Sequence, residues 1–155
     1  LNMTSLVELT HRLLPAMLQR GRGDVLLVSS IAAGMPVPGF GVYAATKAFV
    51  TSFGEALSWE LRGTGVHATV LSPGGTTSEF SAVAGMKPTA VTELGMMPAR
   101  QVAAIGLRAT AKGKRSVISG WMNAIMMWIA PRLLPLGLRL WASALFQRLA
   151  GSSVG

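Results

Sequence analysis

The chain has 155 residues, of which 50% are hydrophobic and 13% charged. This composition excludes a disordered chain and suffices for one packed domain. There is no cysteine, which excludes disulfides, thiolate metal sites and cysteine nucleophiles. The two histidines, His11 and His67, lie far apart, so we expect no metal site.

The net charge is +8, and every acidic residue precedes residue 94 while eight basic residues follow residue 99. This asymmetry favours attraction of the C-terminal part to an anionic surface, either lipid or nucleic acid.

The first third of the chain alternates between helix and strand patterns. Apolar residues at helical spacing predict a helix over residues 5–20, and Pro15 inside it is expected to kink that helix. The run 25–28 follows a glycine turn and is continuously apolar, which predicts a strand of a parallel sheet that is buried on both faces. Three glycines and two prolines between residues 34 and 41 predict a loop.

The same alternation continues downstream. We expect a helix over 43–62, a buried strand over 66–71, a helix over 98–110 and a short strand over 116–118. Residues 81–96 have weak periodicity, which indicates a mobile excursion. Helices that alternate with apolar strands predict the α/β class, with a doubly wound, Rossmann-like parallel sheet.

Residues 121–155 have a different pattern and are expected to form a helical tail outside the α/β part, residues 1–120. The uncharged run 116–131 is too short for a membrane-spanning helix, because such a helix needs about 20 apolar residues. Tryptophans beside arginines suit a segment that lies in a membrane interface. A lid or a dimer contact explains the same residues. Both interpretations stay open.

Three side chains point to proton-transfer chemistry. Ser30 ends the first predicted strand, at the carboxyl edge where α/β folds bind ligands. Tyr43 and Lys47 are four residues apart and therefore share one helical face, about 5 to 6 Å apart at Cβ. A nearby ammonium favours phenolate, which lets a tyrosine exchange a proton with an alcohol or carbonyl oxygen. The Ser30 hydroxyl can hydrogen-bond the same oxygen.

The order strand, serine, glycine- and proline-rich loop, Tyr-x-x-x-Lys helix, strand and Pro73-Gly74 resembles the catalytic half of the short-chain dehydrogenase/reductase family. The resemblance covers residues 1–120. It implies hydride transfer between NAD or NADP and a carbonyl or alcohol substrate. In that reaction Tyr43 would be the acid/base, Ser30 would polarise the substrate oxygen, and Lys47 would support Tyr43 and bind the cofactor ribose.

The resemblance implies further site residues. Asn2 matches the family asparagine that is linked through water to the lysine. The cofactor-binding set comprises Tyr43, Lys47, Pro73, Gly74, Gly75, Thr76 and Ser78, with Thr77 in the same segment. The substrate pocket would be lined by Met35, Val37 and Phe40, which favours a hydrophobic carbonyl compound.

The family's glycine-rich phosphate turn has no counterpart in this sequence, because the glycines Gly21 and Gly23 precede a strand rather than follow one. We therefore expect an N-terminally truncated domain, the C-terminal part of a longer enzyme. The alternative is a non-catalytic binding or scaffold protein that kept the fold, with or without membrane association.

Partner and location predictions follow from the same features. The resemblance implies a homodimer or homotetramer through the tyrosine helix, where Ala44, Ala45, Ala48 and Ala56 permit close contact. Only Lys112, Lys114 and Arg115 cluster among the late basic residues, so we expect no nucleic acid partner. The expected location is cytoplasmic, with peripheral contact of the tail to a membrane as the open alternative.

Overall fold

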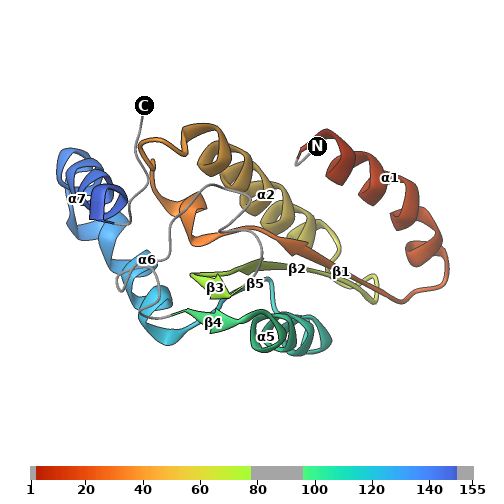
Figure 1. The fold of residues 1–155 in the computed structure, drawn as a ribbon. Coiled ribbons are helices and arrows are strands. Elements are labelled where there is room, and N and C mark those ends of the chain that lie inside the picture. The colour runs from red at the N-terminus through yellow and green to blue at the C-terminus, as the bar shows by residue number, and fades with distance from the viewer. Residues whose placement is uncertain (1–2, 78–95, 150–155) are drawn as a thin grey trace.

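The computed structural model describes residues 3–77 and 96–149, and this part of the chain alternates between helices and parallel strands (Figure 1). The elements in chain order are α1 (Thr4–Gln19), β1 (Gly23–Val28), the 3-10 helix η1 (Ile31–Gly34), α2 (Gly41–Glu60), β2 (Val66–Ser72), β3 (Thr76–Thr77), β4 (Met97–Pro98), α5 (Ala99–Ala111), β5 (Ser116–Ile118), α6 (Trp121–Leu133) and α7 (Leu136–Leu149).

The main sheet has the strand order β1-β2-β5, and all of its pairs are parallel. Val28 pairs with Leu71, and Ser72 pairs with Ile118, so the carboxyl ends of the three strands meet at one edge. Helices α1 and α2 cover one face of the sheet and α5 covers the other (Figure 1). This arrangement confirms the predicted doubly wound, Rossmann-like α/β fold.

Helices α2 and α5, on opposite faces of the sheet, each approach it closely at a glycine. A Cβ added at Gly54 of α2 would lie 2.5 Å from Cγ2 of Val70, and one added at Gly106 of α5 would lie 2.8 Å from Cδ2 of Leu71. Between them, β2 is buried at every position except His67. The central strand and these glycines therefore fix the positions of the two helices, and α2 carries two of the predicted catalytic residues.

One local prediction, the burial of β1, needs correction. Strand β1 is not buried on both faces: its residue Val28 is 49% exposed. In the described part of the sheet β1 is an edge strand, and so it has a neighbouring strand on one side only. Pro15 lies inside α1, which continues to Gln19, and the kink expected at Pro15 stays a prediction. The short pair of β3 and β4 was not predicted, since two-residue strands have no detectable alternation. The excursion predicted at 81–96 lies outside the described residues except for Met96.

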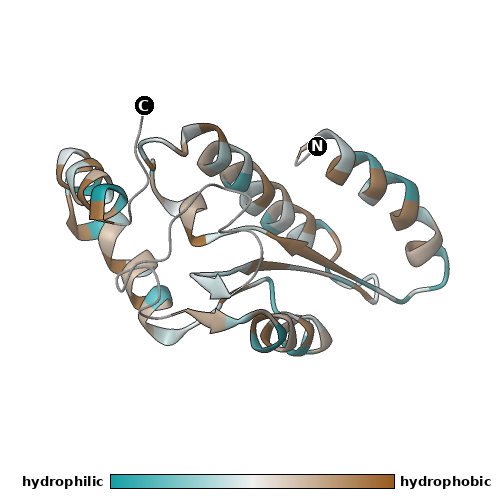
Figure 2. Ribbon diagram, viewed as in Figure 1, coloured by the Kyte–Doolittle hydropathy of each residue, from teal (hydrophilic) through white to brown (hydrophobic). Residues whose placement is uncertain are grey.

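The tail forms two helices, α6 and α7, next to the carboxyl edge of the sheet. Among the described residues, no helix has the length and hydrophobicity that crossing a membrane requires. Helix α6 is mainly hydrophobic, like β1 and β2, whereas α7 carries both hydrophobic and hydrophilic residues (Figure 2). Large apolar side chains stay exposed on both helices: Trp121, Met122, Ile125, Met126, Trp128, Leu133, Leu136, Leu138, Trp141, Leu145, Phe146 and Leu149.

Candidate active site

Ser30 lies at the carboxyl edge of the sheet, where β1 has ended and η1 begins. It is the N-cap of η1, and its Oγ accepts a hydrogen bond of 3.1 Å from the amide of Ala32. This contact uses an oxygen lone pair of the side chain, so the hydroxyl proton stays available for donation. Ser30 therefore lies at the carboxyl edge, as predicted from the sequence.

Tyr43 and Lys47 lie on α2, which packs against η1. The Lys47 Nζ is 5.8 Å from the centre of the Tyr43 ring, which agrees with the predicted common face. The same Nζ donates a hydrogen bond of 2.9 Å to the carbonyl oxygen of Val28. Desolvation by burial lowers the pKa of Lys47 below its ordinary value. The lysine is thus anchored to the end of β1, two residues before Ser30.

A second serine, which the sequence analysis missed, fixes the distance between β1 and α2. Ser29 is 3% exposed, its hydroxyl donates to the carbonyl oxygen of Lys47 at 2.8 Å, and it contacts the Thr51 hydroxyl at 2.6 Å. Because Ser29 and Ser30 are adjacent in the chain, the hydrogen bonds of the Ser29 side chain also restrict the position of Ser30. Ser29 therefore holds α2 beside the serine turn, while Ser30 stays available for chemistry.

The turn after β2 lies beside the serine turn. The amide of Ile31 donates to the carbonyl oxygen of Pro73 at 3.0 Å, which joins η1 to the Pro73-Gly74 segment. Gly74 in turn donates its amide to the Ser119 Oγ at 3.1 Å. The sequence analysis did not single out Ser119, because its partner lies 45 residues away along the chain.

Of the remaining predicted cofactor residues, Gly75 and Thr76 continue this turn. The Thr76 hydroxyl donates to the Gly74 carbonyl oxygen at 3.0 Å, and the Gly75 carbonyl oxygen accepts from the Met97 amide at 2.9 Å. Gly75 and Thr77 are exposed, so this segment can contact a ligand. Asn2 and Ser78 lie outside the described residues.

The three predicted substrate residues lie between η1 and α2. Met35 directly follows η1, and the Val37 carbonyl oxygen accepts from the Phe40 amide at 3.0 Å. The Phe40 ring meets the Tyr43 ring edge-on, with 6.5 Å between the ring centres. All three side chains are partly buried, and Phe40 brings an apolar surface to the predicted acid/base.

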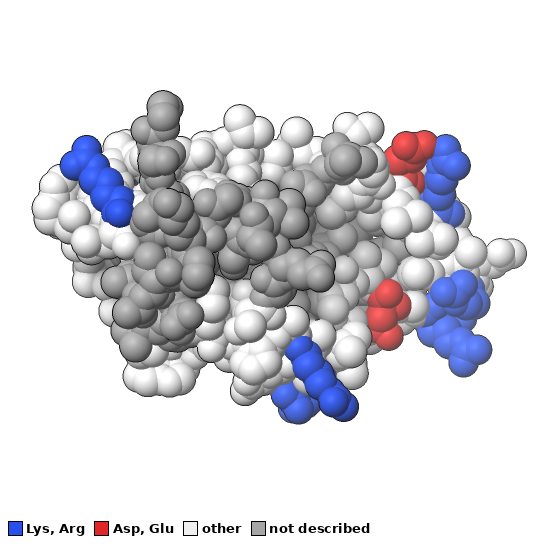
Figure 3. Space-filling view, viewed as in Figure 1, with Lys and Arg blue, Asp and Glu red and all other residues white. Residues whose placement is uncertain are grey.

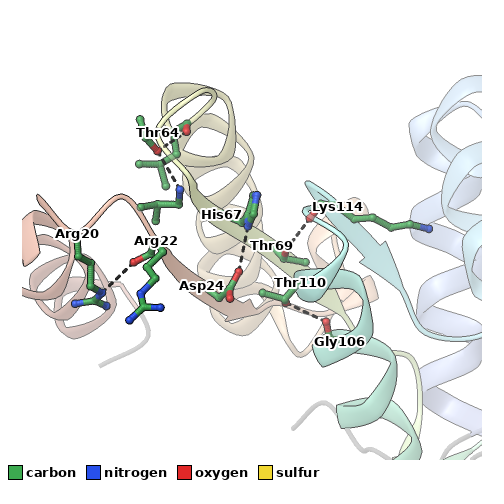
Figure 4. Close-up of polar contacts among 11 residues, drawn as sticks. Arg20, Arg22, Asp24, Thr64, His67, Thr69, Gly106, Thr110 and Lys114 are labelled. Atoms are coloured by element: carbon green, nitrogen blue, oxygen red, sulfur yellow. Dashed lines mark hydrogen bonds and ion pairs between the residues drawn. The ribbon is translucent and has the colours of Figure 1, made fainter. Parts of the chain in front are cut away.

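The opposite, amino edge of the sheet has its own polar contacts (Figure 4). His67 Nδ1 lies 3.2 Å from Asp24 Oδ1, and the Thr69 hydroxyl donates to the Lys114 carbonyl oxygen at 2.6 Å. A groove of about 380 Å³ lies here, lined by Ser58, Leu61, Arg62, Gly63, Gly65, Val66, His67, Gly113 and Arg115. It is far from the residues that carry the predicted chemistry. On the face drawn in Figure 3, the lysines and arginines stand in separate places.

These features agree with known proteins of one class. A family model described as short chain dehydrogenase matches residues 1–89, which is more than half of the chain. The chain belongs to this family. The sulfoacetaldehyde reductase of Chromohalobacter salexigens is 47% identical over 83 residues, which cover 53% of this chain and 33% of that protein. The NADP-dependent 3-hydroxy acid dehydrogenase of Salmonella typhi is 43% identical over 85 residues, 53% of this chain and 34% of that protein.

Solved structures extend the likeness into the tail. A 7β-hydroxysteroid dehydrogenase superposes with a TM-score of 0.77 at 23% identity, covering 97% of this chain and 56% of the other. A short-chain dehydrogenase from Sphingobium yanoikuyae in complex with NADPH has a TM-score of 0.72 at 27% identity, covering 89% and 53%. The chain thus matches about a third of these curated relatives and about half of these solved chains.

Proposed function

We propose that the natural protein carrying this sequence is a NAD(P)-dependent oxidoreductase that interconverts a carbonyl compound and its alcohol. One observation supports the proposal most: η1, which Ser30 caps, packs against α2, which carries the only tyrosine and a lysine bonded to the end of β1. Membership of the short-chain dehydrogenase family supports it. A bound NADPH in the Sphingobium yanoikuyae relative supports the cofactor class, with NAD as the other member of that class.

The residues present suit the nicotinamide end of such a cofactor. Pro73, Gly74, Gly75 and Thr76 form a partly exposed turn, and the bond from Ile31 to Pro73 keeps this turn next to Ser30. A nicotinamide held there would supply hydride to the substrate carbon. The strand and glycine-rich turn that seat a pyrophosphate do not occur in this sequence, so these residues account for one end of the cofactor only.

In the direction of reduction, the protein residues manage the proton and the oxygen. Ser30 donates a hydrogen bond from its hydroxyl to the substrate oxygen and so fixes the position of that oxygen. The Ala32 amide, which donates to the Ser30 Oγ, orients the Ser30 hydroxyl. Tyr43 transfers its phenolic proton to that oxygen as negative charge develops, and solvent returns a proton to Tyr43. The Lys47 Nζ lies 5.8 Å from the centre of the Tyr43 ring, where its positive charge would attract the negative charge that this transfer leaves on the phenol oxygen.

The proposed substrate is a hydrophobic carbonyl compound. Met35, Val37 and Phe40 are partly buried next to Tyr43 and offer apolar surface. Burial of apolar substrate surface contributes about 25 cal/mol per Å² to binding. An apolar ketone is therefore expected to have a higher kcat/KM than a small charged aldehyde.

The test is the oxidation of NADPH and NADH by the purified natural protein with a series of carbonyl compounds. Tyr43→Phe is expected to lower kcat about 10²- to 10⁴-fold, because the phenolic proton is removed with little change in shape. Trp59→Phe, which changes an aromatic residue near the amino edge of the sheet, is the matched control. Specific ligand binding with no turnover of either dinucleotide would favour the binding or scaffold protein instead.

Two partner proposals accompany this function. The first is a homodimer or homotetramer that uses α2, and its support is the exposure of Val42, Ala45 and Phe49 on that helix. Light scattering of the natural protein and of Val42→Asp measures it, and an unchanged monomeric mass in both would contradict it.

The second partner proposal is peripheral contact of α6 and α7 with an anionic membrane in the cytoplasm. The exposed apolar residues of these helices and the exposed Arg132 and Arg148 support it. Sedimentation with vesicles of neutral and anionic lipid measures it. Equal recovery of the protein with neutral and with anionic vesicles would contradict an electrostatic attraction between the arginines of the tail and the lipid.

A further inference from the structure

Helix α6 connects the tail to the Pro73-Gly74 turn through hydrogen bonds. The Asn123 Nδ2 donates to the Ser119 carbonyl oxygen at 2.8 Å, and the Ser119 Oγ accepts from the Gly74 amide at 3.1 Å. Ser119 itself is 1% exposed, and its amide donates to the Ser72 carbonyl oxygen at 3.1 Å. A continuous chain of bonds therefore runs from the first turn of α6 to the turn that follows β2.

Close packing reinforces the same connection. A Cβ added at Gly74 would overlap the side-chain Nδ2 of Asn123, so the Asn123 side chain occupies the space that a side chain at position 74 would need. One turn further along α6, the end of the Met127 side chain lies where a Cβ of Gly34 would be. Gly34 is the last residue of η1, which Ser30 caps. One face of α6 thus contacts both turns that carry the proposed site.

We infer that Asn123 is a positioning residue, which through Ser119 holds the Gly74 turn at the distance from Ser30 that nicotinamide binding requires. This inference rests on the proposed function for the identity of the ligand. Asn123 acts on the turn and not on the reacting atoms. Its role would explain why Gly74 has no side chain, since any larger residue would displace Asn123.

The first experiment measures amide hydrogen exchange by NMR in the natural protein and in Asn123→Asp. This substitution keeps the size of the side chain, removes the Nδ2 hydrogens and turns an oxygen toward the Ser119 carbonyl. Exchange of the Gly74 amide is expected to become about three- to tenfold faster, as the loss of one net hydrogen bond predicts. Met122→Leu, next to it on α6 and 60% exposed in the natural chain, is the control and leaves this rate unchanged.

An internal reference separates positioning from general loss of stability. The Val70 amide, on the same strand as Ser72, donates to the Arg115 carbonyl oxygen at 2.8 Å. In Asn123→Asp its exchange is expected to stay constant. Equal acceleration at Val70 and Gly74, or no acceleration at Gly74, would overturn the inference, whether or not the protein binds a dinucleotide.

The second experiment measures the Kd for NADPH in a double-mutant cycle. In the natural protein, Gly74→Ala is expected to raise the Kd for NADPH about tenfold, because the added Cβ overlaps the Asn123 side chain. In a protein that already carries Asn123→Ala, the same Gly74→Ala change is expected to raise Kd by a smaller factor, because the overlap is then relieved. Additive effects would overturn the inference. No binding of NADPH or NADH by the natural protein would count against the proposed function, and the exchange result would still decide the role of Asn123.

Discussion

The two edges of the sheet differ in what their polar groups do. At the carboxyl edge, Ser29, Lys47 and Ser119 each bond to the backbone of another element. At the amino edge, the pair of His67 and Asp24 has side chains that are 51% and 56% exposed, beside the groove of about 380 Å³. The residues that line this groove include none of the residues of the proposed site. The carboxyl edge differs in that its polar side chains are held in place by hydrogen bonds, which is what the proposed catalysis would require.

Two serines test this difference most directly. Ser30→Ala at the carboxyl edge is expected to lower kcat/KM about 10²- to 10³-fold, the usual effect of removing a donor to a developing oxyanion. Ser58→Ala, in the amino-edge groove, is expected to leave kcat/KM unchanged. Steady-state rates with NADPH and an apolar ketone measure both. Comparable losses in the two variants would mean that the two edges do not differ in function.

The neighbouring Ser29 sharpens the comparison in terms of stability. Ser29→Ala removes a donor to the Lys47 carbonyl oxygen at a buried position and is expected to lower the free energy of unfolding by about 1 to 3 kcal/mol. Asp24→Asn weakens an exposed contact with His67 at the other edge and is expected to cost less than about 1 kcal/mol. Urea unfolding measures both values, and a larger cost for Asp24→Asn would reverse the comparison.

Sequence patterns predicted much of the fold because they depend on local properties. Apolar periodicity placed the main helices and strands within two residues at most ends, and the spacing of Tyr43 and Lys47 placed both on one face. The missed features depend on tertiary position. Strand β1 reads as fully buried because its residues are apolar, whereas its exposure depends on its place in the sheet. The contact of Asn123 with Gly74 joins segments that no local pattern relates.

The smallest expected effect concerns the charge of Lys47. Burial lowers the pKa of Lys47 below 10.5, its ordinary value, so the unfolded chain binds this proton more tightly than the folded one. Between the two pKa values the unfolded state carries more protons, and the free energy of unfolding therefore rises with pH through that interval. Below the lower pKa, the folded state bears the full cost of desolvating the ammonium.

Lys47→Met removes this titration and is expected to flatten the rise in the free energy of unfolding at pH values below 10.5. Urea unfolding at a series of pH values measures it, and the difference between the two curves isolates Lys47 from other groups. Lys112→Met, which removes an exposed ammonium on the turn after α5, should retain the rise. Parallel curves for the natural protein and Lys47→Met would mean that Lys47 is as well solvated in the folded chain as in the unfolded one. Desolvation of the Lys47 ammonium would then no longer distinguish the carboxyl edge from the amino edge.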